Sequence, residues 1–117
     1  MISGIKRTHQ VEIEGIGLFV MKLLTIKDRI EVSKRMEELS LKYGIEPKNI
    51  ENIDFTKVSF KDYPYILIYS LSVLEKAIVE KPDGVNIEEL PEGVIATLFA
   101  EYMAFEGFFR KREVSAQ

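Results

Sequence analysis

The longest apolar stretch of the chain lies at residues 65–79, YILIYSLSVLEKAIV, in which only Glu75 and Lys76 carry charge. Because its apolar side chains fall on every side of a helical wheel, the pattern predicts a helix that is buried all round. A strand over residues 65–69 is the alternative, but the length of the run favours a helix. The charged pair interrupts the run well before the roughly 20 residues that a membrane span requires.

Two starts are open for this helix. A start at Ser59, with Asp62 three residues on, resembles a capping box but leaves Pro64 inside the helix, where it would bend the axis. A start near Tyr63 places the same proline in the first turn, where its missing N–H does no harm. We favour the later start, and Pro82 limits the helix at the other end.

A change of pattern at residues 10–23 predicts a β-hairpin. Val11 and Ile13 alternate with glutamates, and a second apolar run follows Gly15 and Gly17, which can adopt the positive φ of a turn. This glycine pair lacks the third glycine and the following helix of a dinucleotide-binding loop. A lone hairpin is marginal in water, so we expect it to pack on helices or to pair with a strand of another chain.

A first amphipathic helix is predicted over residues 25–43. Thr25 followed by Asp28 is typical of a helix N-terminus, and Gly44 is typical of a C-terminal stop. The apolar stripe of this helix recurs in steps of four, three and four, at Val32, Met36, Leu39 and Tyr43.

The last helix is predicted to start at Pro91 or Glu92 and to continue to about Arg112, with acid at its start and base at its end. Its apolar stripe alternates steps of three and four, at Ile95, Leu98, Tyr102, Phe105 and Phe109.

The remaining segments are connections and termini. Residues 45–62 hold apolar anchors without a sustained period, which predicts a tethered connection with a short helix near Pro47. A turn is predicted at residues 81–84 and one helical turn at residues 86–90. The polar ends, residues 1–9 and 113–117, are expected to be loosely ordered.

These elements define the expected fold. At 117 residues the chain is one domain's worth of sequence, so residues 1–117 are expected to form a single domain. We expect an α+β, mostly helical fold, with an N-terminal β-hairpin followed by three main helices packed around the central apolar helix.

Charge and composition narrow the function classes. The net charge is −3 and the basic residues are interleaved with acids, so nucleic acid is an unfavoured partner. The chain has no cysteine, which excludes disulfides and thiolate chemistry. Because the N-terminus lacks the apolar core of a secretion signal, we expect a protein of the cytoplasm that has no membrane contact.

Residues with catalytic potential have simpler interpretations. His9, the only histidine, has no spaced ligand partners, so we interpret it as a solvated side chain. Ser70 and Ser72 lie in the buried helix, where we expect them to bond the carbonyls of the preceding turn. The adjacent glutamates at 37–38 and 88–89 do not converge on one point and are interpreted as charged surface. We therefore expect no enzyme and neither a cofactor nor a metal site.

An aromatic cluster near the C-terminus leaves two interpretations open. Phe105, Phe108 and Phe109 lie beside Arg110 and Arg112. In the more common arrangement, all three rings complete the core. In the other, part of this surface stays open, because aromatic residues rimmed by arginine are typical of protein interfaces, and these five residues bind a partner.

Two stretches together resemble the tail assembly chaperones of long-tailed bacteriophages and prophages. The first is KLLTIKDRIEVSKRMEEL, residues 22–39, and the second is YSLSVLEKAIVEKPDGVNIEELPEGVIATLFAEYMAFEGFF, residues 69–109. Members of that family similarly have a strand followed by L-T and a charged helix. A helix ending I-V-x-x-P and a closing helix with aromatic residues near its end come later in their chains.

The resemblance implies a non-catalytic protein that escorts the tape-measure protein and recruits tail-tube subunits in the host cytoplasm. It also implies a longer frameshifted form, and a chain ending at Gln117 is what we expect of the short form. The family transfers no catalytic or contact residue, and a homo-oligomer is compatible with it. The alternative is a structural tail-completion or connector component that stays in the virion.

Overall fold

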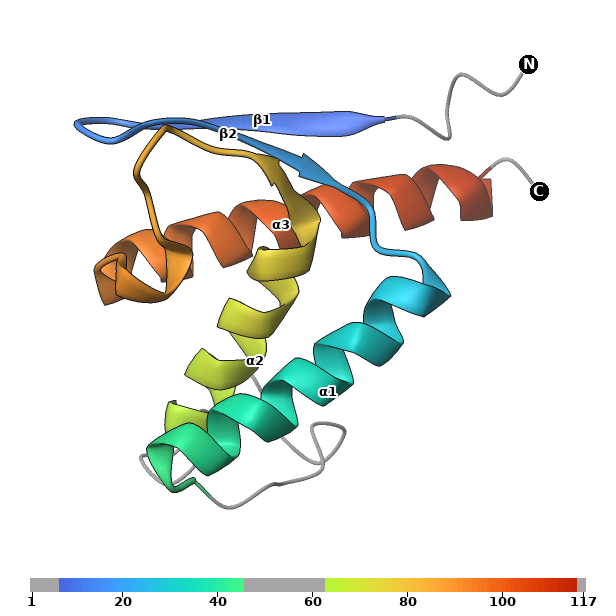
Figure 1. The fold of residues 1–117 in the computed structure, drawn as a ribbon. Helices are drawn as coiled ribbons and strands as arrows, with labels where there is room; N and C mark the ends of the chain where they lie inside the picture. Colours follow the sequence, from blue (N-terminus) through green and yellow to red (C-terminus); the bar gives the residue numbers. More distant parts are fainter. Residues whose placement is uncertain (1–6, 46–62, 116–117) are drawn as a thin grey trace.

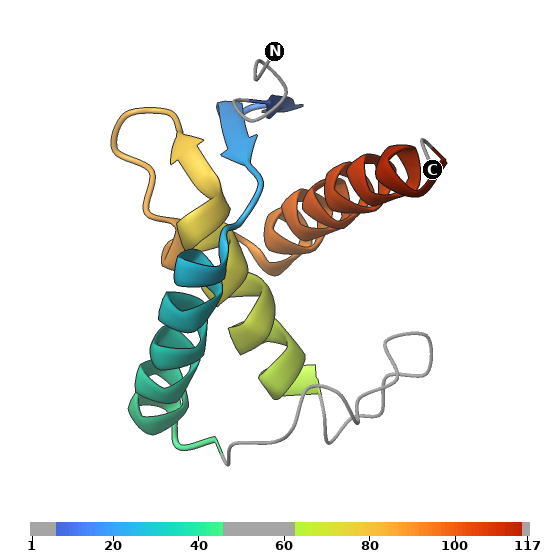
Figure 2. The same ribbon diagram turned by 90° about the vertical axis from the view of Figure 1, so that its right-hand side faces the viewer.

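The computed structural model describes residues 7–45 and 63–115, with side chains up to residue 107. Within this part of the chain the fold is α+β, which confirms the predicted class: an antiparallel sheet in the order β1-β2-β3 stands against three helices (Figures 1 and 2). The elements are β1 Thr8–Ile13, β2 Gly17–Lys22, α1 Ile26–Tyr43, α2 Tyr63–Ala77, β3 Ile78–Glu80, the short 3₁₀ helix η3 Ile87–Glu89 and α3 Glu92–Ser115.

The predicted hairpin is confirmed. Strands β1 and β2 pair antiparallel from Thr8 opposite Lys22 to Ile13 opposite Gly17. The turn between them uses Gly15 at φ 84°, a left-handed conformation that glycine adopts without steric cost. Because β1 already begins at Thr8, the expectation that residues up to 9 are loosely ordered is wrong for its last two residues.

Strand β3 was not predicted. Helix α2 ends at Ala77, two residues before the predicted end, and the chain continues as a strand in which Ile78 pairs with Met21 and Glu80 with Val20. β-branched residues such as Ile78 and Val79 favour extended backbone. The hairpin thus finds its third strand within its own chain.

Helix α1 has the caps that were predicted. The backbone N–H of Asp28 donates to Thr25 Oγ1 at 3.1 Å, and the N–H of Thr25 donates back to Asp28 Oδ2 at 3.0 Å. Gly44 closes the helix at φ 66°. A cap of this kind is worth about 1 kcal/mol, so α1 has fixed ends.

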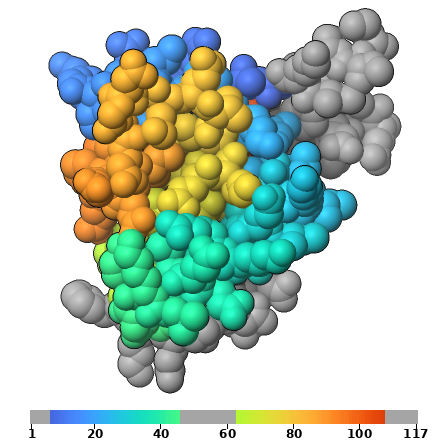
Figure 3. Space-filling view, in the orientation of Figure 1, coloured from blue at the N-terminus to red at the C-terminus, as the bar shows by residue number. Residues whose placement is uncertain are grey.

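Helix α2 is described from Tyr63, with Pro64 next to it; Ser59 and Asp62, which would mark the earlier start, lie outside the described residues. It lies between α1 and α3 (Figure 2). The hydroxyls of Ser70 and Ser72 donate to the carbonyls four residues earlier, at 2.9 and 2.8 Å, as expected. In the space-filling view α2 shows only in a narrow region between its neighbours (Figure 3).

The main core lies where α2 and α3 meet the inner face of the sheet. Phe19, Leu74 and Leu98 have no exposed surface. Burying a side chain of this size contributes about 1.5–3 kcal/mol. The core is formed by Val11, Phe19, Met21, Val32, Val73, Leu74, Ala77, Ile87, Ile95, Leu98 and Tyr102.

Helix α3 continues to Ser115, so the predicted end near Arg112 and the loose order of residues 113–115 are wrong. The turn at residues 81–84 is confirmed, with Gly84 at φ 79°, and so is the helical turn that follows it. The short helix expected near Pro47 and residues 116–117 lie outside the described residues. In the part of the chain that is described, no helix is long and apolar enough to cross a membrane.

Candidate functional site

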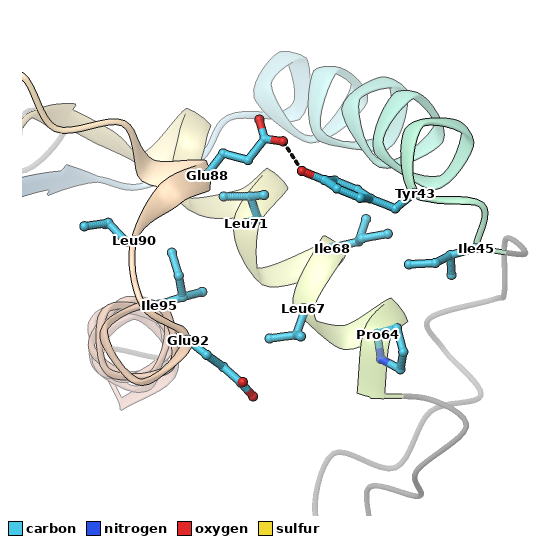
Figure 4. Close-up of a pocket in the computed structure, with 10 residues that line it drawn as sticks. All are labelled: Tyr43, Ile45, Pro64, Leu67, Ile68, Leu71, Glu88, Leu90, Glu92 and Ile95. Carbon is cyan, nitrogen blue, oxygen red and sulfur yellow. Dashed lines mark hydrogen bonds between the residues drawn. The ribbon is translucent and has the colours of Figure 1, made fainter.

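An apolar groove of about 320 Å³ opens between the C-terminal end of α1, one side of α2 and the start of α3 (Figure 4). Leu67 and Leu71 of α2 point into it, and both are half-buried. The prediction that α2 is buried all round is therefore wrong on this side. The groove is lined by Tyr43, Ile45, Pro64, Leu67, Ile68, Leu71, Glu88, Leu90, Glu92 and Ile95.

Leu67 and Leu71 of α2 form the long wall of the groove. Leu67 and Leu71 are four residues apart and so lie one above the other on a single face. Ile68 is buried beside them, while Ile95 of α3 and Leu90 close the opposite wall. The groove is thus walled mainly by aliphatic side chains, which suits apolar atoms rather than a charged substrate.

One carboxylate at the rim collects donors from α1. Glu88 accepts from Lys42 Nζ at 2.6 Å, from the hydroxyl of Tyr43, and from Arg35 Nη2 at 3.3 Å. The hydrogen bond from Lys42, followed by that from Tyr43, lowers the pKa of Glu88 below its usual value. The interpretation of residues 88–89 as plain charged surface is therefore wrong for Glu88, whose side chain is only 15% exposed.

The same arginine also joins α1 to α2. Arg35 Nε donates to Glu75 Oε1 at 2.8 Å and Nη2 donates to Glu75 Oε2 at 3.3 Å, a two-pronged contact. The hydrogen bond to Glu75 is the largest cause that raises the pKa of Arg35. Bidentate pairs fix geometry as well as charge. Through its contacts with Glu75 and Glu88, Arg35 holds α1 beside both α2 and η3.

A second polar cluster lies where α1, α2 and α3 meet near the sheet, away from the groove. Arg29 Nη2 donates to Glu106 Oε2 at 2.5 Å and Nη1 to the hydroxyl of Tyr69 at 3.3 Å. The buried Tyr102 donates to the same Glu106 oxygen at 2.9 Å. Burial, followed by the hydrogen bond to Glu106, raises the pKa of Tyr102. This cluster ties the three helices together.

His9 is not the solvated side chain that was expected. Its Nε2 lies 2.8 Å from Glu101 Oε1, and its ring stacks on Phe105 with the centroids 5.2 Å apart. Both partners belong to α3, so the contact joins β1 to that helix. Across the described residues, no group of three or more His, Asp or Glu side chains could hold a metal ion.

The predicted partner surface at the C-terminal end is placed only in part. Phe105 is half-buried against His9. Phe108, Phe109, Arg110 and Arg112 follow it on α3, and their side chains lie outside the described part of the chain. The partner surface formed by these five residues stays a prediction.

Sequence reasoning missed the groove as a whole. It placed Leu67 and Leu71 in the core, because no pattern along α2 shows which of its faces lacks a neighbour. A weak signal was available: apolar residues on every side of α2 need more covering surface than two helices and a hairpin provide. Comparisons of the chain with protein-family models, curated proteins and solved structures found no match.

Proposed function

We propose that this chain is a tail assembly chaperone of long-tailed phages, which holds an apolar segment of the tape-measure protein in the groove beside Leu67 and Leu71. It works in the host cytoplasm without catalysis and also recruits tail-tube subunits. The observation that carries the proposal is the groove itself: a hollow with mainly aliphatic walls opens beside α1, a helix that is capped at both ends.

Of the two stretches that resemble the chaperone family, residues 69–109 supply five of the ten residues that line the groove, and residues 22–39 supply a contact at its rim. Residues 22–39 run from the end of β2 through most of α1, which carries Arg35. Residues 69–109 run from α2 through η3 into α3, and supply Leu71, Glu88 and Ile95. The proposal therefore joins the groove to the segments in which the sequence resembles that family.

The size of the groove suits a temporary partner. A hollow of about 320 Å³ accepts a few aliphatic side chains, and each contributes about 1.5–3 kcal/mol on burial. Part of this is offset by the ordering of the bound segment. The result is a weak, reversible contact, as an escort that leaves the finished particle requires. Exposed Glu92 at the rim favours a basic residue at the end of that segment.

Co-expression with tape-measure fragments tests the proposal. Leu67→Glu places a charge in the groove and should reduce recovery of the fragment at least tenfold, whereas the matched control Ser33→Glu, on the exposed side of α1, should leave recovery unchanged. Phe108→Asp tests the C-terminal surface in the same assay. Equal recovery with Leu67→Glu and Ser33→Glu would contradict the groove.

Two further outcomes would contradict the proposal. If Leu67→Glu strongly destabilises the isolated chain, Leu67 is part of the chain's own packing and not of an open groove. If mass spectrometry finds the protein in stoichiometric amount in purified virions, it is a structural tail component and not a chaperone.

A further inference from the structure

The walls of the groove offer a bound segment little backbone to pair with. They come from the end of α1, from α2, and from η3 with the start of α3, and none of the groove-lining residues belongs to the sheet of the described chain. The backbone groups of a helix bond within that helix. At the end of α1, the N–H groups of Gly44 and Ile45 donate to the carbonyls of Leu41 and Ser40. A bound segment therefore has to satisfy most of its own N–H and C=O groups.

A helix meets this requirement, whereas an extended segment does not. Covered by aliphatic walls, the backbone of an extended segment would lose its hydrogen bonds to water without finding new partners, which costs free energy. The spacing along α2 also suits a helix. Leu67 and Leu71 are separated by about 6 Å along the helix axis, and side chains on one face of a second helix recur at the same interval. The two rows of side chains can therefore interdigitate.

The two carboxylates that line the groove differ in their surroundings. Glu88 accepts hydrogen bonds from Lys42 and Arg35, so its charge is already compensated. Glu92, the first residue of α3, is exposed, and the ion pairs among the described residues do not include it. In Figure 4 its side chain points away from Glu88, toward the side of the groove on which Pro64 lies. The rim thus carries an uncompensated negative charge at its Pro64 end.

We propose that the groove binds an amphipathic α-helix of the partner, which lies antiparallel to α2 with a lysine or arginine of its last turn against Glu92. Its aliphatic side chains recur at intervals of three and four residues on the face toward Leu67 and Leu71. This inference rests on the proposed function and adds the conformation, the direction and the charge of the bound segment.

The direction follows from the helix dipoles and from Glu92. Helix α2 runs from Tyr63 toward Ala77, so the positive end of its dipole is directed toward the Pro64 end of the groove. An antiparallel helix brings its negative, C-terminal end there. Basic side chains stabilise that end of a helix, and Glu92 pairs with the same side chain from the wall. A parallel helix would instead bring its basic last turn toward Lys42, which bonds Glu88 at the other end.

Fluorescence anisotropy of labelled peptides, each about 15 residues long so that a helix can form, measures binding to the full chain. The first peptide has leucines at alternating intervals of three and four residues and one lysine in its last turn. The second has the same composition with the lysine moved to the first turn. The third has proline in place of an outward-facing alanine near its middle. The first should bind about tenfold or more tightly than the third, and about threefold more tightly than the second.

Variants of the chain assign these effects to residues. Glu92→Gln should remove the preference for the first peptide over the second, whereas Glu37→Gln, on the exposed surface of α1, should retain it. Leu67→Glu should abolish the binding of the first peptide. Circular dichroism of each variant checks that the chain remains folded.

Equal binding of the first and third peptides overturns the helical conformation. A preference for the first peptide over the second that survives Glu92→Gln, or no such preference in the wild type, overturns the direction. Self-association of the chain that Leu67→Glu abolishes, with no peptide bound, assigns the groove to a second copy and overturns the proposal as well. Failure of the proposed function is a separate result, in which the first peptide binds through Leu67 but tape-measure fragments are not recovered.

Discussion

The hydroxyl of Tyr43, the last residue of α1, donates a hydrogen bond to the carboxylate of Glu88 in η3, 45 residues along the chain (Figure 4). Lys42 Nζ donates to the same carboxylate oxygen at 2.6 Å. One side chain thus joins the end of a helix to the opposite wall of the groove.

Replacement of that carboxylate should loosen the groove without unfolding the chain. Glu88→Gln keeps the shape but loses the charge that Lys42 and Arg35 contact, so we expect the free energy of unfolding to fall by about 1 kcal/mol. The pKa of Glu88 is lowered from 4.5 in the folded chain. Its contribution is therefore present above pH 4.5 and is lost at lower pH. Urea titrations at pH 7 and pH 3 measure the loss of unfolding free energy in Glu88→Gln and its dependence on pH. Glu37→Gln, on the exposed surface of α1, is the control.

The capping carboxylate of α1 should show a sharper acid dependence. Hydrogen bonds from the Lys22 side chain and the Thr25 backbone lower the pKa of Asp28 from 3.8 to about 2. Asp28→Ala should cost about 1–2 kcal/mol of unfolding free energy at pH 7. The loss should shrink as the pH falls from 3.8 toward 2, because the wild type then becomes protonated. A difference between wild type and variant that is the same at pH 7 and pH 2 would contradict this, and Asp83→Ala, in an exposed turn, controls for lost charge.

Much of the fold could be predicted because its signals are local. Thr25, Asp28 and Gly44 mark the ends of α1, and the caps observed there need no distant partner. Strand β3 could not be predicted in this way. Ile78 and Val79 continue an apolar run that also suits a helix, and their extended backbone is selected by pairing with β2, more than 50 residues earlier.

The groove and the contact of His9 could not be predicted either, because both depend on residues that are far apart in the sequence. His9 finds Glu101 across 92 residues, and Leu67 borders a hollow whose other walls come from η3 and α3. Helical periodicity shows that a residue is apolar and on which face it lies. It does not show whether another element covers that face.

The buried tyrosine of α3 links stability to alkaline pH. Tyr102→Phe removes the hydroxyl that donates to Glu106 and accepts from the N–H of Leu24, so we expect a loss of about 1–2 kcal/mol in unfolding free energy. Burial raises the pKa of Tyr102 above 10.0. The folded state therefore loses stability as the pH rises above 10, because the unfolded chain ionises there first.

Denaturant titrations at pH 7 and pH 10.5 measure this effect. The wild type should lose more stability between the two values than Tyr102→Phe does. Tyr63→Phe, which changes an exposed ring, should behave as the wild type does. An equal loss in wild type and Tyr102→Phe would show that the phenol of Tyr102 is not held neutral by the fold.

Amide hydrogen exchange of the chain, alone and bound to a tape-measure fragment, tests the central claim most directly. If the groove holds the fragment, binding should slow exchange in α2 around Leu67 and Leu71 and from η3 to Ile95, with little change in the β1–β2 hairpin. Protection confined to the hairpin or to the last turns of α3, with the groove unchanged, would contradict it.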